Sequence, residues 1–171
     1  MTKEEVTLKL TYVGFILIAF ELIKSLIVKP IKFFYEISTI SGSSLFHSYE
    51  VDVMSRHKNE FEACLLYLRD FMKAIDLEDF LTIQELREHR NNLAHNLVNE
   101  LPNLDIKKYF SLLERVDKAL FNLSRHQTFI EIGADPEFKD VDWNILKGHE
   151  YLLFEEILKK INNLQMKDDN E

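Results

Sequence analysis

Apolar residues recur every three or four positions over long segments of this chain, and this helical period is the feature that most restricts its fold. The clearest example is the segment 56–75, whose apolar residues include Phe61, Cys64, Leu65, Leu68, Phe71, Met72 and Ile75. A second segment, 105–123, carries Phe110, Leu113, Val116, Leu120 and Leu123. Only four glycines and three prolines occur in 171 residues, far fewer than turn-dense β folds use. We therefore predict an all-α fold, an up-and-down bundle of about five helices.

Proline, glycine and capping residues predict where the first helices begin and end. A first helix is expected over residues 4–28, with a stop or kink where Pro30 restricts the residue before it. The Ser- and Gly-rich segment 38–44 is typical of a loop, and the second helix follows over 56–75. Thr82 with Glu85 has the form of a capping box, which predicts that a third helix opens there.

The C-terminal part contains weaker signals of the same kind. Pro102 is expected to end the third helix, and the fourth is expected to run from Asp105 to Gly133. Asp135 and Pro136 predict one short turn before a last helix over 145–164. We assign residues 1–165 to a single helical domain and 166–171 to a frayed tail.

The N-terminal segment is apolar enough to resemble a membrane span. Its longest uncharged stretch, residues 10–20, is about half of the roughly 20 residues that a span needs, and Glu21 and Lys24 follow it. We predict a buried helix and no membrane contact; a segment that touches a membrane is the less favoured alternative. The single cysteine, Cys64, cannot form an internal disulfide and is expected in the core of a cytoplasmic protein.

The third predicted helix contains the strongest anomaly in the sequence. At about 100° per residue, its apolar stripe consists of Leu86, Leu93 and Leu97. Arg90 falls within this stripe, where a leucine is expected. Because a guanidinium stays charged and is very costly to bury unpaired, Arg90 needs a partner. It either forms a structural ion pair, with Glu21 or Glu62 as candidates, or faces a cleft or subunit interface that an anion can enter.

Two polar residues follow this arginine on the same helix. Asn91 and His95 lie four residues apart and therefore share one face. Arginine binds phosphate bidentately and stabilises developing negative charge, while histidine transfers protons near neutral pH. The combination suits phosphodiester chemistry. On an ideal helix, however, Arg90 and His95 point about 140° apart.

The segment RNNLAH, residues 90–95, resembles the Arg-x4-6-His motif of HEPN (higher eukaryote and prokaryote nucleotide-binding) domains. This resemblance covers six residues closely and extends to the setting, a long helix late in a small all-α bundle. It implies a homodimer that brings two motifs into one cleft. It also implies a metal-independent endoribonuclease, a toxin or phage-defence effector that leaves 2′,3′-cyclic phosphate ends. Its partners would be RNA and an antitoxin protein.

Carried over to this chain, the motif assigns a catalytic role to three residues. Arg90 would bind and stabilise the scissile phosphate, His95 would act as general acid or base, and Asn91 would orient the histidine or the phosphate. Two alternatives stay open. The chain is either a non-catalytic HEPN-like binding or regulatory module, or a helical protein-interaction domain in which Arg90 forms a structural ion pair.

The overall charge is unfavourable for a surface that coats nucleic acid. The 21 Lys and Arg residues are outnumbered by 29 Asp and Glu residues, which gives a net charge of −8. Binding to RNA needs cations along the phosphate path, so a local basic lip is required. The candidates for this lip are Lys107, Lys108, Arg87 and Arg125.

No metal or cofactor is expected. Glu85 and His89 lie four residues apart and could share a metal, but a solvated ion pair is the simpler interpretation. The acidic residues of 135–142 lack the ligand order and central glycine of a calcium loop. The segment 41–44 lacks the patterns of a phosphate loop or a nucleophile elbow, which leaves it as a connector.

Overall fold

The computed structural model describes residues 2–40, 47–106, 109–133 and 135–168, and every regular element in these ranges is helical. The helices are α1 (Lys3–Ile40), α2 (Tyr49–Asp52), α3 (Glu60–Asp70), α4 (Leu77–Glu100), α5 (Phe110–Ile132) and α6 (His149–Asp168). Short 3-10 turns occupy Met54–Arg56, Leu101–Asn103 and Pro136–Phe138. The prediction of an all-α helical bundle is confirmed.

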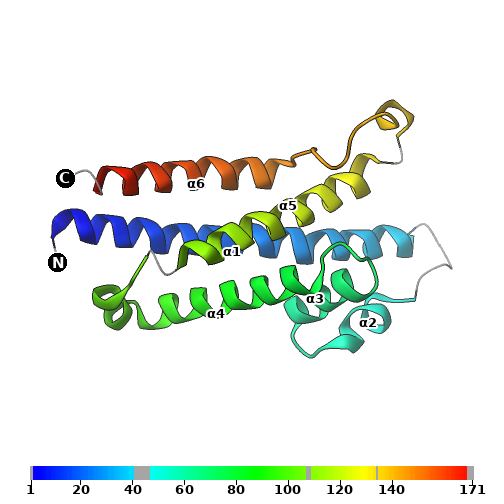
Figure 1. The fold of residues 1–171 in the computed structure, drawn as a ribbon. Coiled ribbons are helices and arrows are strands. Elements are labelled where there is room, and N and C mark those ends of the chain that lie inside the picture. Colours follow the sequence, from blue (N-terminus) through cyan, green and yellow to red (C-terminus); the bar gives the residue numbers. More distant parts are fainter. Residues whose placement is uncertain (1, 41–46, 107–108, 134, 169–171) are drawn as a thin grey trace.

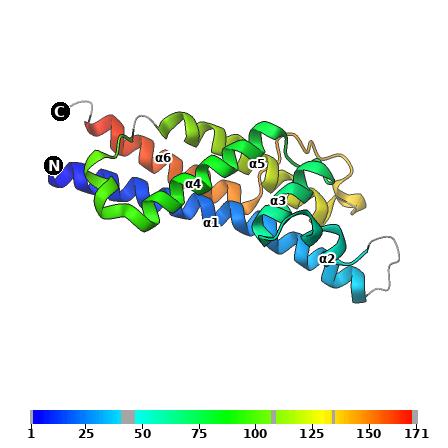
Figure 2. The same cartoon turned by 90° about the horizontal axis from the view of Figure 1, so that it is seen from below.

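Helix α1 runs through the middle of the bundle and contacts α3, α4, α5 and α6 (Figures 1 and 2). The chain runs along α4 and α6 in the direction opposite to α1, and along α5 in the same direction (Figure 1). The ends of α1 and α6 that lie nearest the chain termini are at the same end of the bundle. This arrangement agrees with the up-and-down topology expected of long helices joined by short connections.

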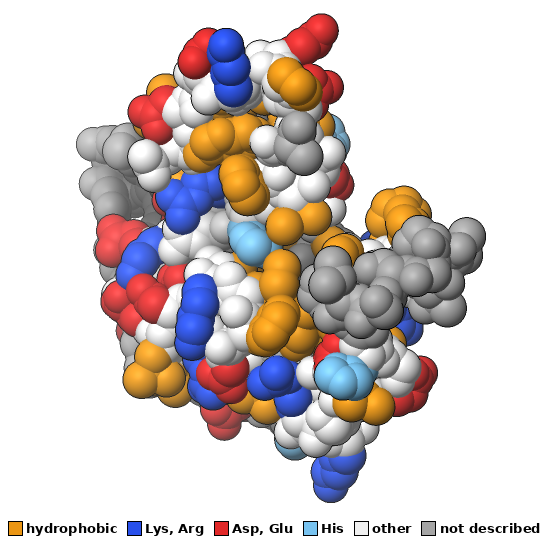
Figure 3. Space-filling view, turned by 90° about the vertical axis from the view of Figure 1, so that its right-hand side faces the viewer, with side chains coloured by type: hydrophobic (Ala, Val, Ile, Leu, Met, Phe, Trp, Pro, Cys, Tyr) orange, Lys and Arg blue, Asp and Glu red, His pale blue; other side chains and the backbone are white. Residues whose placement is uncertain are grey.

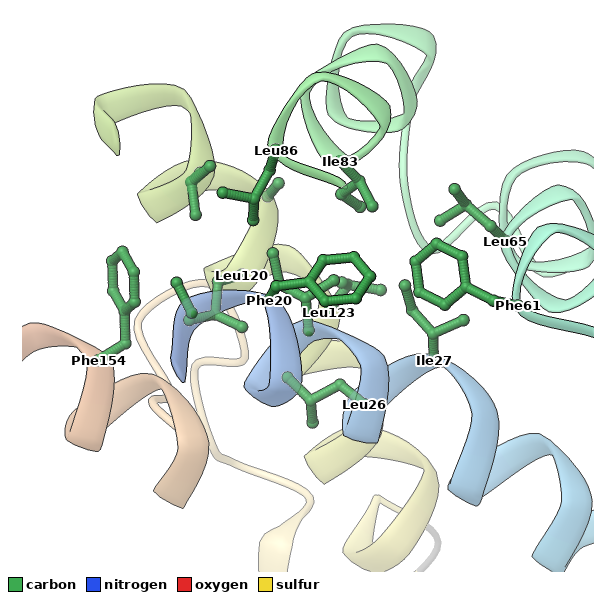
Figure 4. Close-up of a cluster of buried hydrophobic side chains, with 14 of the residues drawn as sticks. Phe20, Leu26, Ile27, Phe61, Leu65, Ile83, Leu86, Leu120, Leu123 and Phe154 are labelled. Atoms are coloured by element: carbon green, nitrogen blue, oxygen red, sulfur yellow. The ribbon is translucent and has the colours of Figure 1, made fainter. Parts of the chain in front are cut away.

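The core forms where the apolar faces of these helices meet α1. Figure 4 shows side chains from five helices in this cluster, including Phe20, Leu26, Ile27, Phe61, Leu65, Ile83, Leu86, Leu120, Leu123 and Phe154. Each of these is less than 9% exposed. Fully burying a large apolar side chain stabilises a fold by about 1.5–3 kcal/mol, so packing against α1 dominates the stability of the bundle.

The predicted end of the first helix at residue 28 was wrong, because α1 continues through Pro30 to Ile40. Beyond the proline, Ile31 and Tyr35 are buried. The Tyr35 hydroxyl lies 3.0 Å from an Asp52 carboxylate oxygen and 3.1 Å from the hydroxyl of Tyr67. These tertiary contacts offset the roughly 3 kcal/mol that a proline costs inside a helix.

Two other N-terminal boundaries differ from those predicted. Helix α4 begins at Leu77, and Asp76 and Asp79 form its capping box: Asp76 Oδ1 accepts from the Asp79 N–H at 2.8 Å, and Asp79 Oδ2 accepts from the Asp76 N–H at 3.3 Å. The box predicted at Thr82 was wrong, since Thr82 is buried inside the helix. Helix α3 is shorter than 56–75, because Asn59 caps its start.

The C-terminal elements also start later than predicted. Helix α5 begins at Phe110 instead of Asp105, and it ends with Gly133 as its capping residue, as expected. Asp135 caps the short turn by accepting from the Glu137 N–H at 2.9 Å, which confirms that prediction. Helix α6 covers His149–Asp168 instead of 145–164, so it extends into the tail predicted to fray. The predicted loop 38–44 lies partly in α1, and positions 41–44 lie outside the described residues.

Helix α1 is long and apolar enough over Lys3–Ile37 to cross a membrane, judged by length and composition. Half of its most apolar window is buried inside the protein. The absence of membrane contact stays a prediction.

Candidate functional site on helix α4

The middle of α4 presents its apolar stripe to the core, as the periodicity predicted. Leu86 and Leu93 are at most 1% exposed, and Leu97 is half-buried. Arg90 lies in this stripe, but its side chain is 29% exposed. The residues that follow on the outer face, including His95 and Val98, are exposed. The motif therefore lies where a core-facing stripe meets the protein surface.

The described neighbours of Arg90 balance its positive charge and satisfy its hydrogen-bond donors only in part. Its Nη2 atom lies 3.6 Å from Glu21 Oε1, and its Nη1 atom donates to Asn91 Oδ1 at 3.1 Å. The guanidinium carbon is 5.4 Å from the centre of the Phe20 ring. The Nε atom is buried and has no hydrogen-bond partner within the described ranges. Of the two predicted ion-pair partners, Glu21 is the one in contact.

The Arg90–Glu21 contact does not form a closed ion pair. The Glu21 side chain is 56% exposed, and the same carboxylate lies 3.7 Å from Lys24 Nζ. A solvent-screened pair of this kind contributes about 0–1 kcal/mol, whereas an unpaired buried donor such as the Arg90 Nε costs about 1–3 kcal/mol. The guanidinium therefore has one weak, solvent-exposed ionic contact and one buried donor without a hydrogen-bond partner in the described part of the chain.

Glu62, the other predicted partner of Arg90, belongs to a different arginine. It accepts a hydrogen bond from Arg87 Nη1 at 2.9 Å and a short one from the Gln84 amide. Arg87 also lies over the Phe61 ring. Its charge is therefore already matched, and Arg87 does not supply the predicted basic lip.

Arg125, another candidate for the basic lip, has its described contacts away from the motif. Arg125 lies over the Phe121 ring, and it lines a pocket with Arg69 and Asp79 that includes no residue of 90–95. Lys107 and Lys108 lie outside the described residues.

Asn91 contacts the arginine of the motif. Its side-chain oxygen accepts from Arg90, so it fixes one end of the guanidinium. The resemblance implied a role in orienting the histidine or the phosphate. The observed contact places Asn91 against Arg90, and its role in orienting the histidine or the phosphate stays a prediction.

His95 is exposed, and no described residue forms a hydrogen bond or ion pair with its imidazole. The helix is interrupted directly after it, because Asn96 has φ −124° and ψ 24°. Residues 90–95 precede this break and keep helical geometry, so the separation of about 140° between Arg90 and His95 persists. One chain by itself does not bring the two side chains together.

His89, not singled out as a core residue from the sequence, is buried at the inner edge of the same segment. Its Nε2 atom lies 3.1 Å from the Tyr12 hydroxyl, and its ring stacks on Tyr109 with 3.8 Å between ring centres. Burial lowers the pKa of His89. The predicted Glu85–His89 ion pair was wrong, because Glu85 pairs with Arg115 at 2.8 Å. The available signal was spacing: His89 lies three residues after Leu86 and four before Leu93.

The end of the bundle away from the termini has an apolar surface. Hydrophobic side chains gather there around a histidine (Figure 3). A pocket between α1, α3 and α5 is lined by residues such as Pro30, Met72 and His126, and its volume is about 60 Å³. This volume is well below the roughly 150 Å³ of a cavity that binds benzene, so the pocket suits no sizeable ligand.

Within the described ranges, no three His, Cys, Asp or Glu side chains gather as a metal site would require. The chain matches no family model, no curated protein and no solved structure.

Proposed function

We propose that this protein is a HEPN-like, metal-independent endoribonuclease of the toxin or phage-defence type, acting in the cytoplasm through a cleft formed by two copies. The observation that carries the proposal is the state of Arg90. Its guanidinium is held in place by Asn91, has a buried and unpartnered Nε, and faces one exposed carboxylate at 3.6 Å. A phosphate group that displaces the exposed Glu21 carboxylate would gain a charged partner in this guanidinium.

Arg90 binds two oxygens of the scissile phosphate through its planar donor fork. Charge-assisted bidentate contacts of this kind are stronger than the solvent-screened contact with Glu21. The same donors stabilise the extra negative charge that the phosphorus centre develops in the transition state. Asn91 holds Nη1, which reduces the rotational freedom that the guanidinium loses on binding.

His95 transfers the protons. The ribose 2′-oxygen attacks the adjacent phosphorus and loses its proton to one neutral imidazole, while the bond from phosphorus to the 5′-oxygen breaks and that oxygen receives a proton from the second imidazole, which enters the step protonated. The products are a 2′,3′-cyclic phosphate and a free 5′-hydroxyl. Because Arg90 and His95 diverge by about 140° on one helix, a site with two imidazoles and a central arginine requires two copies of α4.

A non-catalytic binding or regulatory module is the second candidate, and the acidic surroundings favour it. Glu21 lies against Arg90, Arg87 is neutralised by Glu62, and the net charge is −8. A partner such as an antitoxin would then use Arg90 as an anchor for an acidic group. In the third alternative, a helical interaction domain, the Arg90–Glu21 contact is structural only.

The deciding experiment incubates the purified protein with mixed RNA in the presence of EDTA. We expect chelator-resistant cleavage with 2′,3′-cyclic phosphate ends, lost by at least about 100-fold in His95→Ala, as for removal of a general acid–base. His149→Ala is the matched control, because it removes another exposed histidine, on α6. Intact RNA at high protein concentration overturns the enzyme, and RNA binding without cleavage supports the second candidate.

A further inference from the structure

An open pocket with a volume of about 750 Å³ lies at the N-terminal end of α4, between the α3–α4 connection and α5. Most of the side chains that line it are charged: Arg69, Asp70, Lys73, Asp76, Asp79 and Arg125. Cations and carboxylates are equal in number, so the sum of the charges does not identify a ligand. The ligand follows from which of these groups already have partners inside the protein.

Two of the three carboxylates are matched within the protein. Asp70 accepts two hydrogen bonds from Arg69, at 2.6 and 3.0 Å. Asp76 Oδ1 accepts from the Asp79 N–H at 2.8 Å, and Asp76 Oδ2 lies 3.5 Å from Lys118 Nζ. Each of these two acids therefore has a cation beside it, and neither needs a ligand to balance its charge.

Two of the three cations have no such partner. Lys73 and Arg125 form no ion pair and no hydrogen bond with a described residue, and Arg125 lies over the Phe121 ring. Lys73 also has a backbone φ of 54°, the only positive φ of a non-glycine residue in the described part of the chain. The left-handed conformation disfavours lysine relative to glycine. A strained position of this kind is typical of a residue kept for its side chain.

The third carboxylate, Asp79, is 2% exposed and is hydrogen-bonded at one oxygen. Its Oδ2 accepts from the Asp76 N–H at 3.3 Å and from Asn122 Nδ2 at 2.9 Å. Its Oδ1 accepts from no described residue, and no described cation forms an ion pair with it. The pocket thus combines two unpaired cations with a buried acceptor. A ligand that uses all three needs acceptor oxygens and one hydrogen-bond donor.

We propose that this pocket binds inorganic phosphate in a form that keeps a proton. The phosphate oxygens accept from Lys73 and Arg125, and the P–OH group donates to Asp79 Oδ1. Sulfate has the same shape but carries no proton at neutral pH, so the Asp79 carboxylate repels it. A phosphodiester lacks the P–OH group as well, which makes the pocket independent of the proposed RNA cleavage. A phosphate monoester keeps this proton only below its second pKa of about 6.

Isothermal titration calorimetry of the full chain with inorganic phosphate, sulfate and glycerol phosphate tests the assignment at about pH 7.5, where the monoester has lost its proton. Inorganic phosphate should bind at least about tenfold more tightly than either competitor, because a site built to accept a hydrogen bond rejects a ligand without the donor. Asp79→Asn should remove this preference, since an amide can donate to sulfate and still accept from the Asp76 N–H. Equal binding of phosphate and sulfate by wild type, tighter binding of glycerol phosphate, or a preference that survives in Asp79→Asn overturns the proposal.

Lys73→Gly separates binding from folding. The variant should bind phosphate at least about tenfold more weakly, because a charge-assisted hydrogen bond is lost. Its melting temperature should rise, since glycine adopts a positive φ without strain. Arg125→Ala should weaken binding to a similar extent. Lys58→Ala, which removes another exposed lysine without an ion pair, is the control and should leave binding unchanged.

Circular dichroism establishes that each variant is folded, Asp79→Asn above all, because Asp79 belongs to the capping box of α4. Wild type that binds no phosphate at millimolar concentration overturns the proposal. Unchanged phosphate affinity in a folded Lys73→Gly or Arg125→Ala variant does so too. RNA cleavage is not part of this test, so its outcome leaves the proposed nuclease untouched.

Discussion

Arg87 and Arg90 lie one turn apart on α4 and have opposite surroundings. Arg87 donates to Glu62 at 2.9 Å, and the Glu62 side chain is 14% exposed and also bonded to Gln84. Arg90 meets Glu21 at 3.6 Å, and the Glu21 side chain is 56% exposed. The exposures of the two arginines are similar, 30% and 29%. The partner, and not the exposure of the cation, therefore decides whether an arginine is structural or available.

The largest expected effect is on the rate of RNA cleavage when each arginine is substituted in turn. Arg90→Ala should lower RNA cleavage at least about 100-fold, because it removes the donors that stabilise the transition-state charge. Arg87→Ala should leave cleavage within a few-fold of wild type. Arg90→Lys should fall between, since an ammonium keeps the charge but loses the bidentate geometry. The measurement is the initial rate on one labelled RNA. Equal losses for both alanine variants would show that the two arginines do not differ in role.

The free energy of unfolding, measured with urea, should respond in the opposite order: Arg87→Ala should lower it more than Arg90→Ala. Arg87→Ala leaves Glu62 without its charged partner, and we expect a loss of about 1–2 kcal/mol in the free energy of unfolding. Arg90→Ala should cost less than about 1 kcal/mol, because it also removes a buried donor without a partner. A larger loss of stability for Arg90→Ala than for Arg87→Ala would support the alternative in which Arg90 forms a structural ion pair.

Glu21→Gln tests whether the carboxylate next to Arg90 weakens RNA binding. The variant removes the negative charge nearest Arg90 while it keeps the shape of the side chain. We expect RNA affinity to rise about three- to tenfold, which corresponds to the modest free energy of an exposed ion pair. Affinity is measured by fluorescence anisotropy in the His95→Ala background, at a protein concentration that keeps the variant dimeric. Glu4→Gln, which removes an exposed carboxylate elsewhere on α1, is the control and should leave affinity unchanged.

The sequence was informative about this region where periodicity was the signal. The stripe of Leu86, Leu93 and Leu97 and the anomalous Arg90 were readable from spacing, because a helix of known pitch places residues on faces. Glu21 was one of two candidate partners of Arg90. The choice between Glu21 and Glu62 depends on how α1 and α3 pack against α4, which no local pattern encodes.

Helix boundaries were less predictable for a related reason. Pro30 disfavours a helix locally, but burial of the Ile31 and Tyr35 side chains stabilises the helix beyond it. Asp76 and Thr82 are both acceptable capping residues, and burial of Thr82 decides between them. In the proposed two-copy site, the distance from Arg90 of one copy to His95 of the other would likewise depend on assembly.

The buried His89, one residue before Arg90 on α4, gives the prediction with the smallest expected effect, which concerns the pH dependence of stability. His89 is buried against Tyr12 and Tyr109, and burial lowers its pKa below the ordinary value of 6.5. The folded state therefore binds protons less readily than the unfolded state. The free energy of unfolding should fall as the pH drops through 6.5 towards the lower folded value. His126 contributes in the same direction, because burial lowers its pKa too.

His89→Gln should remove one histidine's share of this pH dependence, while glutamine can still bond to the Tyr12 hydroxyl. Tyr12→Phe is the matched control, since it removes the hydroxyl and leaves the imidazole to titrate. It should lower stability at every pH and keep the slope. Urea unfolding between pH 5 and 8 measures both variants. If the slope of His89→Gln equals that of wild type, folding does not suppress protonation of His89, and its burial against Tyr12 would be incorrect.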